Sequence, residues 1–463
     1  MTLLWTMEEL LDATGGTASG HFDAQGVAFD SREIGQGDLF FALKGAETDG
    51  HRFVDKAFAD GAAGAIVSAP SSYPHILVAD TMQALETLGH ASRKRTNAKI
   101  IGVTGSAGKT GTKEAIYASL DRCSRGRAHR SVKSYNNHVG VPLSLARMPS
   151  DAEFGIFEMG MNHAGEMRAL SKIVRPHIAI ITTIAPAHIE FFKDESGIAD
   201  AKAEIFEGLT EGGTAILPAD NMHYPRLRAA AEKYAGRILS FGFSPDADVR
   251  VLSHMPSSCG GSLVTAQVCD AILSFTLSQP GEHWVANSMA VLAAVYAADG
   301  DLAAAGLAMA EMGGLAGRGA RHIIPIDDGE GSLIDESYNA NPASMAATLA
   351  QLGGATGNGR RIAVLGAMKE LGSKSAEYHA ALAQPLADAK VDFAILVGEE
   401  MEYLAQQLTA GVEGPAEFAH CPTAHEALDL LQNYIRASDM ILVKGSNSMG
   451  LSAIVSALTG GEN

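Results

Sequence analysis

The residue types best suited to chemistry in this sequence lie in one short, glycine-rich segment. It reads Gly105-Ser106-Ala107-Gly108-Lys109-Thr110 and directly follows an apolar run at residues 100–103. Glycines allow a turn in which successive backbone N–H groups point at phosphate oxygens, and a helix that begins there adds positive potential. The lysine would reach the terminal phosphates of a nucleotide, and the threonine hydroxyl would coordinate Mg²⁺. The segment therefore predicts a site for ATP and Mg²⁺.

The segment departs from the strict phosphate-loop pattern G-x-x-x-x-G-K-[S/T]. Val103 stands where the first glycine of that pattern belongs, so only the shorter form with two glycines remains. The alternative is a turn that merely joins a strand to a helix. A strand at residues 99–103 and an amphipathic helix at residues 109–120 give the context that phosphate binding requires, which favours the phosphate loop.

Two further side chains are expected beside this loop. Glu158 ends an apolar run at residues 154–158, and His188 follows another at residues 178–184. Because ligands of parallel sheets bind at the carboxyl ends of the strands, these side chains would meet Thr110 there. Both could complete a Mg²⁺ shell, although imidazole is an unusual ligand for so hard an ion. The alternatives are a hydrated carboxylate and an ordinary loop histidine.

Lys202 occupies an unexpected position on the helix predicted at residues 196–209. It shares one helix face with Ile198, Ile205, Phe206 and Leu209. In the simpler interpretation its stem packs on apolar groups while the ammonium reaches water. In the other, its pKa is lowered so that a neutral amine reacts or binds phosphate. The spacing alone leaves both interpretations open.

The elements that position these residues fall into three regions, expected as domains at residues 1–96, 97–317 and 318–463. The first region has strand-like runs at residues 37–43, 64–67 and 76–78 and a helix at residues 53–60. A basic stretch at residues 93–99 is interpreted as a linker. The second region adds the Ala-rich helix at residues 284–298 to the elements named above.

The third region alternates regularly between strands and helices. Strands are predicted at residues 332–335, 361–365, 393–397 and 440–443, with helices at 376–389 and 424–437. Such alternation indicates βαβ units and a parallel sheet. The predicted fold class is therefore α/β, with a small first domain, a central parallel-sheet domain that carries the phosphate loop, and a Rossmann-like C-terminal domain.

Bulk composition excludes several classes of protein. The 463 residues carry a formal net charge of −18, which argues against a nucleic-acid or anionic-membrane surface. Four scattered cysteines form no disulfide or zinc pattern, as is typical of a reducing compartment. The acidic start does not resemble a signal peptide, and each apolar run is shorter than the ~18 residues of a membrane span. We therefore expect a cytoplasmic protein without stable membrane insertion.

Several motifs, in this order along the chain, resemble the Mur ligase family of ATP-dependent amide-bond-forming enzymes. The first region contributes Asp30-Ser31-Arg32, Gly37-Asp38-Leu39-Phe40-Phe41-Ala42-Leu43 and Asp49-Gly50-His51. The central region contributes the phosphate loop, Asn136-Asn137, Glu158-Met159-Gly160, Ala201-Lys202-Ala203-Glu204 and Asn287. The last region contributes Asp335, Tyr338-Asn339-Ala340-Asn341-Pro342 and Lys444-Gly445-Ser446. The resemblance covers essentially the whole chain.

The resemblance implies a three-domain ligase, expected to be a monomer, that joins D-alanyl-D-alanine to a UDP-linked muramoyl tripeptide through an acyl phosphate. It assigns catalysis to Lys109, Lys202, Asn137 and His188, with Lys202 as a carbamate that holds a second metal. The metal ligands would be Thr110, Glu158, His188 and that carbamate. Besides the loop, Asn287, Arg318 and Asp335 would contact the nucleotide. Ser31, Arg32 and Asn136 would contact the UDP-substrate, and Tyr338, Asn339 and Asn341 would lie on the side from which the dipeptide binds.

Two positions depart from the family pattern. Ala367 replaces the usual aspartate of Leu-Gly-Asp-Met, and Asn447 stands where an arginine is common. The alternatives left open are a family member that adds the third stem residue and a folylpolyglutamate synthetase-like ligase. A nucleotide-dependent switch without ligase chemistry is a third. The Asn-Pro-Arg motif of the third-residue ligases is absent here, and folate ligases lack the segment at residues 30–53.

Overall fold

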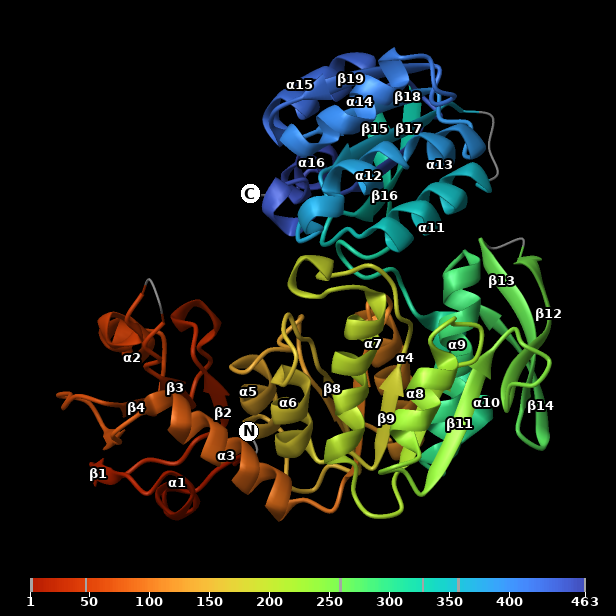
Figure 1. Ribbon diagram of the computed structural model, residues 1–463. Coiled ribbons are helices and arrows are strands. Elements are labelled where there is room, and N and C mark those ends of the chain that lie inside the picture. The colour runs from red at the N-terminus through yellow and green to blue at the C-terminus, as the bar shows by residue number, and fades with distance from the viewer. Residues whose placement is uncertain (1–2, 46–47, 258–259, 327–328, 356–358, 462–463) are drawn as a thin grey trace.

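The computed structural model describes residues 3–45, 48–257, 260–326, 329–355 and 359–461. Within these residues the strands form three separate sheets of five, nine and six strands. The sheets follow one another along the chain, and the nine-stranded sheet lies between the other two (Figure 1). The predicted α/β fold class with three units is confirmed, while the exact boundaries at 96/97 and 317/318 stay predictions.

The N-terminal sheet has the strand order β1-β5-β4-β3-β2 and is parallel except between β1 and β5. Its strands are β1 Thr17–Ser19, β2 Gly26–Ala28, β3 Asp38–Phe41, β4 Gly64–Val67 and β5 His75–Leu77. Its helices are α1 Met7–Thr14, α2 Val54–Ala59 and α3 Thr81–Arg95, with 3-10 turns at Ser31–Glu33 and Gly50–Phe53. Helix α3 leads from this sheet into the central unit (Figure 1).

The central sheet has the order β14-β13-β12-β11-β10-β9-β6-β8-β7. Its parallel part comprises β6 Lys99–Thr104, β7 Ala128–Arg130, β8 Phe154–Glu158, β9 Ile178–Ile181, β10 Thr214–Pro218 and β11 Arg237–Gly242. Strand β12 Val249–Ser257 continues it and then pairs antiparallel with β13 Gly261–Val268, which pairs with β14 Ala271–Leu277. This antiparallel extension was not predicted.

Helices cover the parallel part of the central sheet, so β6, β8 and β9 are almost fully buried, as their apolar sequences require. The helices are α4 Lys109–Ser124, α5 Gly140–Ala146, α6 Glu166–Val174, α7 Glu195–Ala203, α8 Tyr224–Ala231, α9 Glu282–Ala297 and α10 Leu302–Glu311. Two 3-10 turns lie at Ile189–Phe191 and Glu204–Gly208. Strand β6 lies between β8 and β9, so the three carboxyl ends are neighbours.

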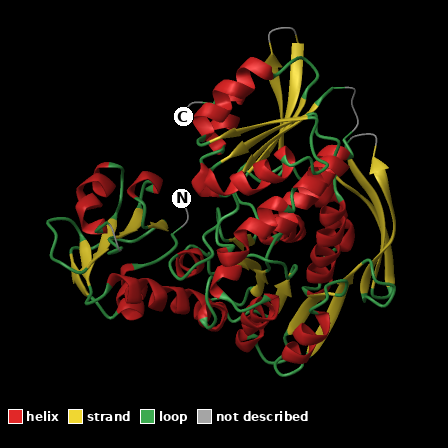
Figure 2. Cartoon of the chain, turned by 45° about the horizontal axis from the view of Figure 1, so that its top comes forward, coloured by secondary structure: helices red, strands yellow, loops and turns green. Residues whose placement is uncertain are grey.

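The C-terminal sheet has the order β15-β16-β20-β17-β18-β19, antiparallel only between β15 and β16. Its strands are β15 Ala320–Ile326, β16 Gly329–Glu336, β17 Arg361–Gly366, β18 Phe393–Val397, β19 Glu417–Cys421 and β20 Met440–Lys444. Its helices, which lie on both sides of the sheet (Figure 2), are α11 Pro342–Gly353, α12 Ser375–Ala380, α13 Ala383–Asp388, α14 Glu402–Thr409, α15 Ala424–Tyr434 and α16 Ser452–Thr459. Short 3-10 turns lie at Gly372–Lys374, Glu399–Met401 and Asn447–Met449.

The predicted boundaries of two helices are wrong. The helix predicted at residues 196–209 ends as an α-helix at Ala203 and continues as a 3-10 turn. The helix predicted at residues 376–389 is divided into α12 and α13, which contains Pro385. Periodicity finds an apolar face, but it does not show where the backbone tightens or breaks. Among the described residues, we find no helix with the length and apolarity that a membrane crossing requires.

The basic stretch at residues 93–99 is not a linker. Residues 93–95 complete α3, and Lys99 begins β6. The buried Arg93 donates from Nε to the carbonyl of Val174 and from Nη2 to that of Arg175, both at 2.9 Å. These carbonyls lie at the C-terminal end of α6, where a cation is favoured. The guanidinium therefore joins α3 to the central unit.

We predict that Arg93→Met lowers the free energy of unfolding by about 2–4 kcal/mol, because two buried carbonyls lose their charged donor. Chemical denaturation followed by circular dichroism measures the change. Lys94→Met is the matched control, since Lys94 is exposed on the same helix. Equal stability of the two variants would show that Arg93 contributes nothing to this junction.

Candidate active site

The phosphate loop has the backbone that its glycines predict. Gly105 and Gly108 have φ angles of 153° and 80°, and α4 begins at Lys109 immediately after them. A Cβ at Gly105 would lie 1.8 Å from Oγ1 of Thr182, so no other residue fits there. The N-terminal amides of α4 therefore form an anion-binding end of a helix.

Hydrogen bonds to the segment that follows β9 hold this loop rigid. Ser106 Oγ donates to the carbonyl of Ala185 at 2.8 Å and accepts from the Ala185 N–H at 3.0 Å. Thr182 Oγ1 donates to the carbonyl of Ala107 at 2.5 Å. Such bonds fix the loop before any ligand arrives, which lowers the entropy that binding costs.

A buried carboxylate lies directly beside the loop. Glu158 is fully buried, and its Oε2 accepts from Thr110 Oγ1 at 2.8 Å. Its Oε1 accepts from Asn136 Nδ2 at 2.8 Å. A hydroxyl and a carboxylate are the hard oxygen donors that Mg²⁺ prefers, so this pair fits the predicted metal. No cluster of three or more His, Cys, Asp or Glu suited to a metal occurs within the described residues.

These residues open into a cleft of about 520 Å³ between the central and C-terminal units. Most predicted site residues line it, namely Ser106, Ala107, Gly108, Lys109, Asn136, Glu158, His188, Asn287, Arg318, Tyr338, Asn339 and Asn341. Gly105 and Thr110 belong to the loop that forms its wall. Residues more than 200 positions apart thus share one cavity.

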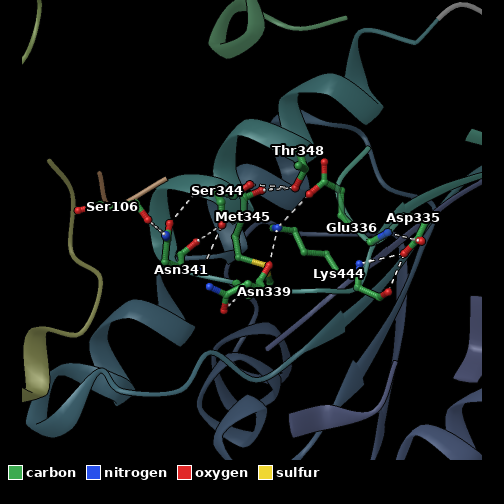
Figure 3. A network of polar contacts seen from close by, with 12 residues as sticks. Ser106, Asp335, Glu336, Asn339, Asn341, Ser344, Met345, Thr348 and Lys444 are labelled. Carbon is green, nitrogen blue, oxygen red and sulfur yellow. Dashed lines mark hydrogen bonds and ion pairs between the residues drawn. The ribbon is translucent and has the colours of Figure 1, made fainter. Parts of the chain in front are cut away.

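Polar side-chain contacts cross this cleft. Asn341 Nδ2 donates to the carbonyl of Ser106 at 3.2 Å (Figure 3), and Arg318 donates from Nη2 to Ser134 Oγ at 3.2 Å. His188 Nδ1 lies 2.5 Å from Glu370 Oε2. The Arg318 guanidinium also lies 4.2 Å above the ring of Tyr338. The two units are therefore held in contact around the loop.

Two lysines near the loop have lowered pKa values. Burial lowers the pKa of Lys109, nearby Arg318 lowers it further, and Glu158 opposes the shift. Burial lowers the pKa of Lys202 well below its ordinary value, and the charge of Lys109 adds to this effect. Lys202 is only 1% exposed, so its amine does not extend into water as the simpler interpretation required.

Two predicted residues have their side chains occupied elsewhere. Asn137 Oδ1 accepts from the N–H groups of Val139 and Gly140 at 3.2 and 2.9 Å, so it caps α5. Asp335 Oδ2 accepts from the Gly317 N–H at 2.6 Å, and its Oδ1 accepts from the N–H and hydroxyl of Ser337. Neither side chain lines the cleft. Their roles in catalysis and nucleotide binding stay predictions.

Two of the residues predicted for the UDP-substrate, Ser31 and Arg32, lie in a 3-10 turn of the N-terminal unit and do not line this cleft. Ser31 is buried, while the Arg32 side chain is 82% exposed and pairs with Asp30 at 2.6 Å. This pairing lowers the pKa of Asp30 to about 2. The adjacent Glu33 accepts from the Tyr135 hydroxyl at 2.8 Å and pairs with Lys133, which links this turn to the segment that carries Asn136.

Several residues that line the cleft were not predicted as site residues. They are Ser134, Thr182, Asp220, Asn221, His283, Trp284, Glu336 and Lys444. Most follow the carboxyl ends of strands or begin a helix, which is the one signal that could have found them. Lys444 belongs to the motif Lys444-Gly445-Ser446, for which the sequence predicts no specific role.

The comparisons with known proteins agree with this geometry. The chain matches the Mur ligase family catalytic domain at residues 23–121, the Mur ligase middle domain at 103–295 and the Mur ligase glutamate ligase domain at 325–447. It is 33% identical to UDP-N-acetylmuramoyl-tripeptide–D-alanyl-D-alanine ligase of Escherichia coli (strain K12), across 98% of each chain. The Bacillus subtilis (strain 168) protein of that name is 34% identical, across 94% of this chain and 93% of that one.

The chain belongs to the Mur ligase family. A crystal structure of MurF from Acinetobacter baumannii matches it with a TM-score of 0.83 and 31% identity, over 98% of this chain and 99% of that one. A MurF ligase from Thermotoga maritima in complex with ADP shares the fold, with a TM-score of 0.75 and 24% identity, over 94% of this chain and 97% of that one.

The departure from the Mur ligase pattern at Ala367 lies inside the C-terminal unit. Ala367 is fully buried, and its N–H donates to the carbonyl of Val397 at 3.0 Å. A methyl group there cannot replace the missing carboxylate. Three residues later, Glu370 supplies a carboxylate to His188 across the cleft.

We predict that Lys202 reacts with CO₂, because burial lowers its pKa and thereby favours the nucleophilic neutral amine. With ¹³C-bicarbonate, NMR of the intact protein should show a carbamate signal that Lys202→Met removes. The signal should weaken as the pH falls toward the pKa of the amine, since protonation blocks the reaction.

Lys233→Met is the control for this experiment, because Lys233 is exposed and its loss should leave the signal unchanged. Absence of a carbamate in active wild-type protein would contradict the assignment. We also expect short carboxylic acids to restore part of the ligase activity that Lys202→Ala loses.

Proposed function

We propose that this Mur ligase is an ATP-dependent, ADP-forming ligase that adds D-alanyl-D-alanine to UDP-N-acetylmuramoyl-tripeptide. The observation that carries the proposal is the cleft in which the phosphate loop, the Thr110–Glu158 pair and the C-terminal residues Arg318 and Asn341 meet. The names of relatives that align over nearly the whole chain support the choice of substrates.

Amide formation needs an activated carboxyl group, and the first step supplies it. The terminal carboxylate of the tripeptide attacks the γ-phosphorus of ATP, which forms an acyl phosphate and releases ADP. Lys109, which donates to the Gly105 carbonyl at 2.7 Å, lies where it can turn to the phosphates. Its charge, that of Arg318 and the amides of the loop would stabilise the negative charge that develops on the phosphoryl oxygens.

Mg²⁺ fits the donor set at the end of this loop. Thr110 and Glu158 would hold the ion, which neutralises phosphate charge when bound. His188 has Nδ1 engaged by Glu370, so only Nε2 remains for a ligand. Carbamylation of Lys202 would replace its buried amine with an anion near Lys109, which suits a second ion.

The second step forms the amide bond. The dipeptide amine, having lost its proton, attacks the acyl carbon, and the tetrahedral intermediate expels inorganic phosphate. Tyr338, Asn339 and Asn341 line the C-terminal side of the cleft, from which the dipeptide would approach. Asn136 contacts Glu158 rather than the N-terminal sheet, so we place it beside the reacting carboxyl and phosphate.

The remaining assignments extend the same proposal. Ser31 and Arg32 would contact the UDP end of the substrate, with the three units at 1–96, 97–317 and 318–463 as the UDP, ATP and dipeptide domains. The product is a precursor of peptidoglycan, and the protein would thereby support cell shape and division. We propose that it acts in the cytoplasm as a monomer and binds no nucleic acid.

A phosphate-release assay over a matrix of UDP-peptides and dipeptides, with mass spectrometry of the product, tests the function. Release should require UDP-tripeptide and D-alanyl-D-alanine together. Lys109→Ala should lower kcat/KM by about 10³-fold, because a preorganised charge at the transferring phosphate is lost.

Lys172→Ala is the control, since Lys172 is exposed on α6 and outside the cleft. Near-normal turnover of Lys109→Ala would refute the role of the phosphate loop. Release with neither substrate present would favour a nucleotide-dependent switch, and activity with a UDP-dipeptide and a single amino acid would favour a ligase of the third stem residue.

A further inference from the structure

A fully buried lysine lies one helical turn beyond the phosphate loop. Lys113 follows Lys109 by four residues on α4, so the two side chains share one face of that helix. The side chain of Lys113 is 0% exposed, and the residue does not line the cleft. The mechanism above gives it no role. A cation at this depth acts through the protein groups that surround it.

The ammonium group of Lys113 has three acceptors, one for each of its N–H groups. Nζ donates to the carbonyl of Ser131 at 2.8 Å and to that of Lys133 at 3.1 Å. It also lies 2.8 Å from Glu114 Oε1, which balances its charge. Both carbonyls belong to the turn segment, which we define as residues 131–137. Lys113 therefore joins the helix of the phosphate loop to the turn segment.

The turn segment contains a strained residue at the point that Lys113 binds. Lys133 has a φ angle of 52°, which is the left-handed region that residues other than glycine seldom adopt. Such a conformation persists where surrounding contacts hold it. Ser131 is fixed to β8 in any case, because its N–H donates to the carbonyl of Ile156 at 3.0 Å. The bond from Lys113 to the Lys133 carbonyl is thus the one that acts on the strained turn itself.

Side chains of the turn segment reach all three units of the protein. Asn136 Nδ2 donates to Glu158 Oε1 at 2.8 Å, beside the phosphate loop. Ser134 Oγ accepts from Arg318 of the C-terminal unit at 3.2 Å. The hydroxyl of Tyr135 donates to a carboxylate of the N-terminal unit at 2.8 Å. The path of the backbone through the turn therefore decides whether these contacts form together.

We propose that Lys113 is a positioning residue for ligation, which holds the turn segment so that Asn136 stays beside Glu158 while substrates bind and react. The inference rests on the proposed function, because it takes Asn136 to lie beside the reacting carboxyl and phosphate. An apolar side chain of similar size would fill the space next to α4. It would leave the Lys133 carbonyl without its charged donor, and the turn would relax.

Loss of Lys113 should affect turnover more than nucleotide binding. The phosphate loop has its own hydrogen bonds through Ser106 and Thr182, which do not involve the turn segment. A displacement of about 1 Å at a reacting group can lower a rate by about 10²-fold. Lys113→Met should therefore lower kcat for ligation by about 10- to 100-fold. The Kd for ATP with Mg²⁺, measured by calorimetry on the full chain, should stay nearly unchanged.

A double-mutant cycle separates positioning from a general weakening of the fold. If Lys113 acts through Asn136, then Asn136→Ala should lower kcat much less in Lys113→Met than in the wild-type protein. Lys113→Met combined with Asn341→Ala is the control cycle, since Asn341 contacts the phosphate loop and not the turn segment. The two effects on kcat should multiply in that control cycle.

Arg122→Met is the matched single variant, because Arg122 is an exposed cation on the same helix and its loss should leave turnover unchanged. Thermal melting shows whether Lys113→Met is folded. If it is not, Lys113→Gln, which keeps N–H donors, takes its place in both cycles.

Three results would overturn the inference and leave the proposed function intact. They are normal turnover without Lys113, a loss of ATP affinity as large as the loss of kcat, and effects that multiply in the cycle with Asn136. Wild-type protein that does not ligate D-alanyl-D-alanine to UDP-tripeptide would instead refute the proposed function.

Discussion

The active site depends on one backbone constraint, which is that the amides of residues 105–110 must point at a single position without a side chain filling it. The left-handed φ angles of Gly105 and Gly108 satisfy this constraint, and the hydroxyl of Thr182 occupies the space next to Gly105. The loop can keep this shape because it joins the middle of a buried sheet to a long helix. That same position in the sheet brings Glu158 and the segment after β9 to the loop.

The cleft also depends on two units of the chain. Its walls come from the central sheet and from the C-terminal sheet, and the contacts of Asn341 and Arg318 across it are single hydrogen bonds. Each such bond contributes only about 1 kcal/mol, so opening the cleft costs little compared with unfolding either unit. A cleft that closes through weak polar contacts can admit large substrates and still exclude water during the reaction.

Local sequence predicted the parts of the fold in which local and tertiary preferences agree. The loop, the strands that end at Glu158 and before His188, and the alternating third region were found because apolar runs and glycines specify them directly. The buried Arg93 and the antiparallel strands β12 to β14 were missed, because a basic residue is usually exposed and because strand pairing depends on distant partners.

The direction of individual side chains was harder to predict than the position of the site. Asn136 faces Glu158, whereas its neighbour Asn137 caps a helix, and Glu336 faces the cleft while Asp335 holds a turn. Adjacent residues of an extended chain point to opposite sides, so a motif can identify a segment of the site without showing which of its members faces the cleft. For Lys202, the spacing on an apolar helix face left open whether the amine is buried or reaches water, and only the structure shows that it is buried.

The central claim is that the tripeptide carboxylate attacks the γ-phosphate of ATP within this cleft. The most direct measurement uses UDP-tripeptide whose terminal carboxyl carries ¹⁸O, followed by mass analysis of the phosphate released during ligation. An acyl phosphate predicts that one ¹⁸O atom passes from the carboxyl group to each phosphate. Phosphate without ¹⁸O, formed together with the ligated product, would contradict the account.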